Sequence, residues 1–100
     1  MNMQALMKQA QAMQKEITGI KSEIDGTVFE GSSSLVSVKA KGTKELVEVK
    51  FLDGAVDLAN DDISMLEDMV VLAINDVFAK IDKTTEQKMG KYSSMMNGLM

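Results

Sequence analysis

The sequence predicts an α+β fold, in which a helix, a three-stranded antiparallel sheet and a long second helix follow one another along 100 residues. Three patterns predict it: a helical apolar repeat in residues 3–24, two alternating runs within residues 35–51, and a broad apolar stripe of helical period in residues 66–81. The chain has no internal repeat and no sign of a second domain. We therefore expect a single domain over residues 1–91 and a flexible C-terminal tail over residues 92–100.

The first predicted helix spaces its apolar residues in alternating steps of three and four, as in a coiled-coil seam. These residues are Met3, Leu6, Ala10, Met13, Ile17, Ile20 and Ile24. Two partners for the seam remain open, namely the protein's own second helix and a helix of another subunit. Gly19 costs roughly 1 kcal/mol inside a helix, so this segment needs a partner of one kind or the other. Asp25 and Gly26 predict its end.

The predicted strands are short and separated by turn residues. A first extended segment, residues 27–29, is followed by a run of Gly and Ser over residues 31–34, which predicts a flexible loop. Residues 35–40 and 47–51 alternate apolar and polar side chains, and a hairpin turn is expected between them at residues 41–43. So small a sheet is marginally stable unless its apolar face is covered.

The second predicted helix supplies that cover. Residues 60–62 predict its start, because Asn and Asp cap helices and suit the positive end of the helix dipole. Its apolar stripe comprises Leu66, Met69, Val70, Ala73, Ile74, Val77 and Ile81. Val71, Leu72 and Phe78 widen the stripe, which predicts burial on two faces, one against the sheet and one against a second subunit. The expected dimer interface comprises Met69, Val70, Ala73, Ile74 and Val77.

Charge is distributed unevenly along the chain. The net charge of −4 argues against a nucleic-acid partner when it is taken as an average. Residues 1–24, however, hold three lysines and two acids, and residues 80–100 hold four lysines and two acids. Residues 25–79 hold four lysines and eleven acids, a side-chain net charge of −7. The two ends are therefore basic, and the body is acidic.

The composition also removes most kinds of catalytic and metal chemistry. Cys, His, Arg, Pro and Trp are all absent, so thiolates and the commonest general base and metal ligand are missing. The aspartates at 53, 57, 61 and 62 lack the spacing of a calcium loop and are interpreted as helix caps. We expect no enzyme activity, no metal, no cofactor and no small-molecule substrate. No apolar run approaches the ~18 residues of a membrane span, and no leader segment is visible, so we expect a cytoplasmic protein without a membrane partner.

Several segments together resemble the YbaB/EbfC nucleoid-associated proteins. They are Leu6–Glu16, Gly31 ahead of Leu35–Val38, Gly42 ahead of Leu46–Val49, and Met65–Val70 followed by Ala73–Asp76. The resemblance covers residues 3–90. It implies an intertwined bacterial homodimer with projecting helical arms, which holds double-stranded DNA at or between the arms. It also implies a place in the nucleoid and an influence on chromosome organisation and gene expression.

The resemblance assigns DNA contacts to the lysines of the two helical ends. These are Lys8, Lys15, Lys21, Lys80, Lys83, Lys88 and Lys91. Without it, the same lysines would be interpreted as a solvated helix face. Lysine suits phosphate contact, whereas bidentate base recognition is mainly made by arginine, so we expect salt-dependent binding with little sequence preference.

Two other functions are compatible with the same sequence. A coiled-coil helix, a hairpin and a second helix also describe a protein-interaction or chaperone module of the prefoldin type, although a first helix of about twenty residues is short for one. The acidic body could instead make the protein a scaffold for a basic partner.

Overall fold

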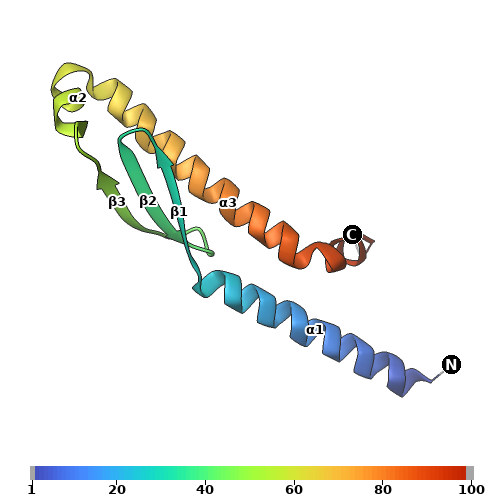
Figure 1. Ribbon diagram of the computed structural model, residues 1–100. Helices are drawn as coiled ribbons and strands as arrows, with labels where there is room; N and C mark the ends of the chain where they lie inside the picture. The colour runs from blue at the N-terminus through green and yellow to red at the C-terminus, as the bar shows by residue number, and fades with distance from the viewer. Residues whose placement is uncertain (1, 99–100) are drawn as a thin grey trace.

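The computed structural model describes the backbone of residues 2–98 and the side chains of residues 2–90 and 92. The elements are α1 (Met3–Gly26), β1 (Val28–Ser33), β2 (Val36–Lys41), β3 (Leu46–Phe51), α2 (Ala55–Asp61) and α3 (Ile63–Gly98). The predicted fold class is confirmed. The molecule measures 71 × 22 × 15 Å because α1 and the C-terminal part of α3 both extend beyond the same end of the sheet (Figure 1).

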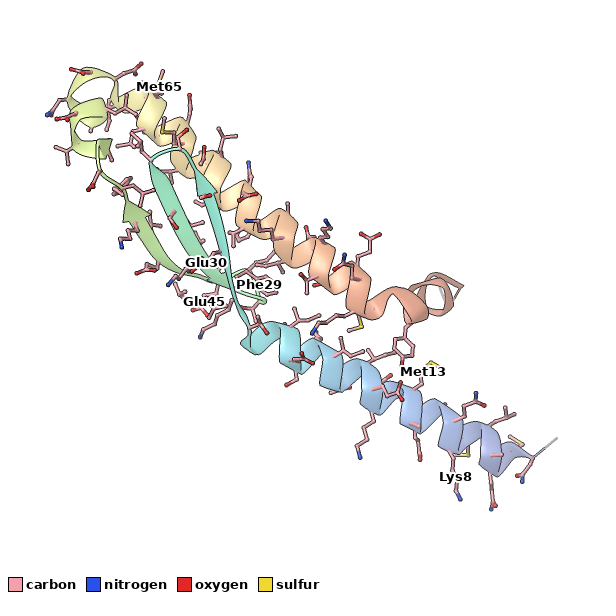
Figure 2. The ribbon with its side chains drawn as sticks, viewed as in Figure 1. Lys8, Met13, Phe29, Glu30, Glu45 and Met65 are labelled. Atoms are coloured by element: carbon pink, nitrogen blue, oxygen red, sulfur yellow. The ribbon has the colours of Figure 1, made fainter. Side chains whose placement is uncertain are left out.

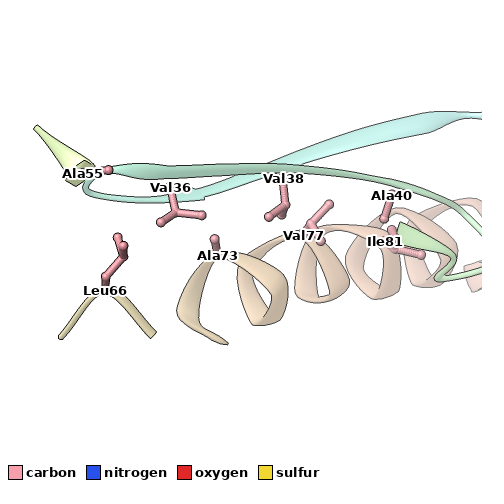
Figure 3. Close-up of a cluster of buried hydrophobic side chains, with 8 residues drawn as sticks. All are labelled: Val36, Val38, Ala40, Ala55, Leu66, Ala73, Val77 and Ile81. Carbon is pink, nitrogen blue, oxygen red and sulfur yellow. The ribbon is translucent and has the colours of Figure 1, made fainter. Parts of the chain in front are cut away.

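The sheet is antiparallel with the order β1-β2-β3, and α3 packs across β1 and β2. Alternate residues of β2 meet one face of α3, as their spacing predicts. The core formed there (Figure 3) consists of Val36, Val38, Ala40, Ala55, Leu66, Ala73, Val77 and Ile81. Each large side chain buried in this way stabilises the fold by about 1.5–3 kcal/mol, so this layer holds the sheet on the helix.

The predicted loop at residues 31–34 is wrong, because β1 continues through Ser33 and only Ser34 and Leu35 form the turn. Ser34 takes a positive φ of 45° there. Gly31 is needed for a close approach and not for flexibility. A Cβ at this position would lie 2.5 Å from the backbone nitrogen of Val77. The glycine therefore lets β1 lie directly on α3.

The start of α3 is only partly as predicted. Asn60 and Asp61 end α2, a short helix that the sequence pattern did not predict. Asp62 caps α3 alone, since its Oδ1 accepts a hydrogen bond of 3.2 Å from the backbone N–H of Met65. In α2, Ala55 is buried in the core and Leu58 packs against it.

Over the C-terminal half of α1, the apolar seam packs against the protein's own α3. Ile24 is buried, and Met13, Ile17 and Ile20 are half-buried. Towards the N-terminus the seam is uncovered, with Met3 73% exposed. The alternative of packing within the subunit is therefore correct for the half of α1 nearest the sheet.

The predicted tail begins inside α3, which continues through Gly98. Tyr92 is buried, and its hydroxyl donates a hydrogen bond to Glu16 of α1. Tyr92 therefore belongs to the folded domain, one residue beyond the predicted boundary. The side chains of residues 93–98, and all of residues 99–100, lie outside the described residues, and the flexibility of the tail stays a prediction.

Candidate nucleic-acid interface

The acidic and basic side chains of α1 lie on different sides of the helix. Glu16 and Glu23 face α3, where Glu23 forms an ion pair of 2.7 Å with Lys88. Lys8 and Lys15 are seven residues apart and share the opposite side, about 140° around the helix from Met13 in the case of Lys8. Figure 2 shows Lys8 pointing away from α3, with Met13 on the side that faces it. The outer side of α1 is therefore positively charged.

The predicted lysines fall into two groups. Lys8, Lys15, Lys21 and Lys83 are exposed, and none of them forms an ion pair within the part of the chain that the structure describes. Lys80 and Lys88 bind carboxylates of their own chain, Asp76 at 3.3 Å and Glu23 at 2.7 Å respectively. The side chain of Lys91 lies outside the described residues. The first group is available for a polyanion, whereas the two paired lysines are already engaged by carboxylates of their own chain.

Lys80 belongs to a small polar cluster between α3 and β1. Its Nζ donates a hydrogen bond of 3.1 Å to the carbonyl of Glu30, and the backbone N–H of Ser32 donates one of 3.0 Å to Asp76. The Ser32 N–H and then the Lys80 ammonium lower the pKa of Asp76 below its usual value of 3.8. Asp76 is therefore ionised at neutral pH, and it attaches the middle of α3 to the edge of the sheet.

An open groove of about 630 Å³ follows the outer side of α1. It is lined by Gln11, Gln14, Lys15, Thr18, Gly19 and Ser22. Apart from Lys15, sequence analysis did not single these residues out as binding residues. Their sequence positions repeat in steps of three and four, as residues on one side of a helix do, and this spacing could have identified them. Most of the surface exposed in the groove is carbon, and Lys15 with the amide and hydroxyl groups at its margin can donate hydrogen bonds to phosphate oxygens.

The opposite end of the molecule is acidic. Residues 51–79 hold seven acids and no lysine, and they form α2 and the first half of α3, which lie far from the N-terminus of α1 (Figure 1). Among the described residues, no group of acids is arranged to hold a metal ion. This end repels a polyanion, so attraction is concentrated on α1.

The expected dimer interface needs a correction. Ala73 and Val77 are completely buried in the subunit's own core, and Met69, Val70 and Ile74 pack against that core. A second subunit cannot reach the first two in this fold, because β1 and β2 already cover them. The mistake arose because a stripe that is apolar on nearly every side does not reveal which side meets the sheet.

An apolar surface is exposed elsewhere, on β3. Val49 and Phe51 pair with Val38 and Val36 of β2, so their side chains lie on the core face of the sheet. They are nevertheless 44% and 53% exposed, because α3 covers only β1 and β2. Val71 on α3 is also 56% exposed. Val49 and Phe51 provide an uncovered extension of the core face of the sheet.

Comparison with known proteins confirms the resemblance deduced from the sequence. Residues 1–96 match the YbaB/EbfC DNA-binding family, which is a family of DNA-binding proteins and not of enzymes. No helix within residues 2–98 has the length and apolar character needed to cross a membrane.

Similar proteins include nucleoid-associated proteins of three bacteria. That of Ligilactobacillus salivarius is 43% identical, with 99% of this chain and 95% of that protein covered. That of Lactococcus lactis is 41% identical (93% and 94% covered), and that of Streptococcus thermophilus is 40% identical (96% and 97% covered). The crystal structure of an uncharacterized protein from Helicobacter pylori has the same fold, with a TM-score of 0.66 at 20% identity over 100% of this chain and 99% of that one. The chain belongs to the YbaB/EbfC DNA-binding family.

Proposed function

We propose that the protein is a nucleoid-associated protein of the bacterial cytoplasm, which binds double-stranded DNA without catalysis and influences the organisation of the nucleoid. The carrying observation is the separation of charge on α1. Lys8 and Lys15 share the outer side and form no ion pair among the described residues, while Glu16 and Glu23 face α3. Lys21 is also exposed and without an ion pair there, and it lies about 120° around the helix from Lys15. A duplex that approaches the outer side of α1 meets positive charge despite the overall net charge of −4.

Little sequence preference is expected from this surface. Lysine contacts phosphate as a point charge, and phosphate contacts are the same on every duplex. Binding should therefore weaken steeply as salt is raised, since each neutralised phosphate releases counterions.

We further propose that the protein acts as a homodimer joined through the apolar side of β3. Val49, Phe51 and Val71 are the side chains that a second subunit would cover. A single α1 offers few cations, whereas two outer faces on one particle can engage the same duplex together, which raises affinity without new contacts.

The test replaces Lys8, Lys15 and Lys21 together by Gln. We expect at least a tenfold loss of affinity for duplexes of unrelated sequence at low salt, because the phosphate contacts are removed. The matched control replaces Lys39, Lys41 and Lys50 of the sheet, which removes the same charge from another surface. Fluorescence anisotropy over a salt series gives both affinities. Equal losses in the two variants, or no loss in the first, would contradict the proposed surface.

A further inference from the structure

Gly19 lies in the middle of α1 without a structural reason in the subunit. Glycine is disfavoured inside helices. Among the described glycines only Gly54 takes a positive φ, and a Cβ on Gly19 would meet no atom within 4 Å. At Gly31 and Gly42, by contrast, a Cβ would collide with the backbone of Val77 and Ile24 respectively. The fold needs the glycine at those two positions, and it does not need one at Gly19.

The missing side chain instead widens the groove on the outer side of α1. Gly19 lines this groove together with Lys15, Thr18 and Ser22. Any side chain at position 19 would project from the helix into the groove, because α1 has no neighbour within reach there. The open space therefore depends on the glycine.

We propose that the groove at Gly19 is a docking site for the sugar-phosphate backbone of DNA. This inference rests on the proposed DNA-binding function and adds a residue that sets how closely the duplex approaches. Lys15 would contact a phosphate as a cation, and the hydroxyls of Thr18 and Ser22 would donate hydrogen bonds to its neighbours. Glycine permits the close approach, as it does wherever a backbone must come near another molecule.

Positive charge favours DNA over a second protein helix at this groove. No carboxylate lines it, and Lys8 extends the positive charge two turns towards the N-terminus. Most of the surface exposed in the groove is carbon, so the preference for a polyanion rests on the charge of Lys15 and Lys8.

The test replaces Gly19 by Gln and, separately, by Ala. Both residues favour the helix, so the melting temperature should rise by several degrees. The affinity for duplex DNA should fall nevertheless, by about tenfold for Gly19→Gln and by less for Gly19→Ala, which adds only a methyl group. A gain in stability combined with a loss of affinity cannot result from unfolding. Gly26→Ala is the control, since it removes another glycine of α1 outside the groove, where a Cβ also meets nothing within 4 Å. It should leave affinity unchanged.

The possible outcomes distinguish a failure of the docking site at Gly19 from a failure of the proposed DNA-binding function. If the wild-type protein fails to retard duplex DNA at low salt, the proposed function itself is wrong. If the wild type binds and Gly19→Gln binds equally well, only the docking site is overturned. A changed oligomeric mass with unchanged DNA affinity would assign the groove to contacts between copies and would also overturn it. The ratio of the two affinities should be the same on duplexes of unrelated sequence, and a ratio that depended on sequence would place base edges in the groove instead of the backbone.

Discussion

The two edges of the sheet differ in whether side chains of α3 bind the backbone of the edge strand. At β1 two of the outward-facing backbone groups are already bound by side chains of α3. Thr27 O accepts a 3.0 Å hydrogen bond from Gly42 N, and the alternation of an antiparallel pair then points the backbone of Glu30 and Ser32 away from β2. Lys80 binds the carbonyl of Glu30, and Asp76 binds the N–H of Ser32. An added strand would need those same groups, so α3 closes this edge.

At β3 the outward-facing backbone groups are open. Leu35 O accepts a 2.8 Å hydrogen bond from Leu52 N, so the backbone of Val49 and Phe51 points away from β2. No hydrogen bond from a described residue reaches these groups, and their apolar side chains are exposed. A subunit with one closed and one open edge can pair through β3 on both sides of a twofold axis. The resulting assembly ends at a dimer, whereas two open edges would allow an open chain of subunits.

The largest expected effect comes from placing a charge at the open edge. Val49→Glu would bury an unpaired carboxylate in the proposed interface, which costs several kcal/mol, and should weaken dimerisation at least a hundredfold. Light scattering should then give the 10.9 kDa of one chain in place of twice that mass. Lys50→Glu is the control, since residue 50 follows Val49 on the opposite face of β3 and should leave the dimer intact. A Val49→Glu protein of unchanged double mass would show that the subunits join elsewhere.

The sequence predicted the parts of the fold that follow from local periodicity. The alternation at Val36, Val38 and Ala40 predicted the buried face of β2, and the stripe through Val77 and Ile81 predicted the face of α3 that covers it. It did not predict that Gly31 belongs to a strand, because only the distance between β1 and α3 requires a glycine there. Composition alone made residues 31–34 resemble a loop.

The same limit applies to the candidate interface. The positions of Lys8 and Lys15 on the outer side of α1 follow from their spacing along one helix. Lys80 pairs with Asp76 four residues earlier in the same helix, a spacing that the sequence could have revealed. The pair of Lys88 with Glu23 joins α3 to α1, and no local pattern reveals it. A count of basic residues at the two ends therefore predicts a region, and it does not by itself separate paired from unpaired lysines.

An intermediate effect is expected from adding a side chain at the closed edge. Gly31→Ala would place a Cβ 2.5 Å from the backbone nitrogen of Val77 and 2.7 Å from the carbonyl oxygen of Ala73. Helix backbone cannot give way as a flexible side chain can, so β1 must shift, at a cost of about 1–3 kcal/mol. The free energy of unfolding in urea should fall by that amount. The opposite sign is expected for Gly19→Ala, and a Gly31→Ala protein as stable as the wild type would mean that β1 does not lie so close to α3.

The smallest effect concerns the charge that holds the closed edge. Because the pKa of Asp76 is lowered on folding by the Ser32 N–H and by Lys80, its carboxylate stabilises the folded state above the unfolded pKa of about 3.8. That contribution is lost as the pH falls through the lower pKa of the folded state. Asp76→Ala should therefore be less stable than the wild type at neutral pH, and the difference should shrink in acid. The effect is small because Asp76 is 39% exposed and the ion pair with Lys80 is screened by solvent. Unfolding of both proteins across the pH range, with hydrogen exchange at the Ser32 amide, measures it. A stability difference independent of pH would mean that the edge is closed by packing of α3 and not by the Asp76 carboxylate.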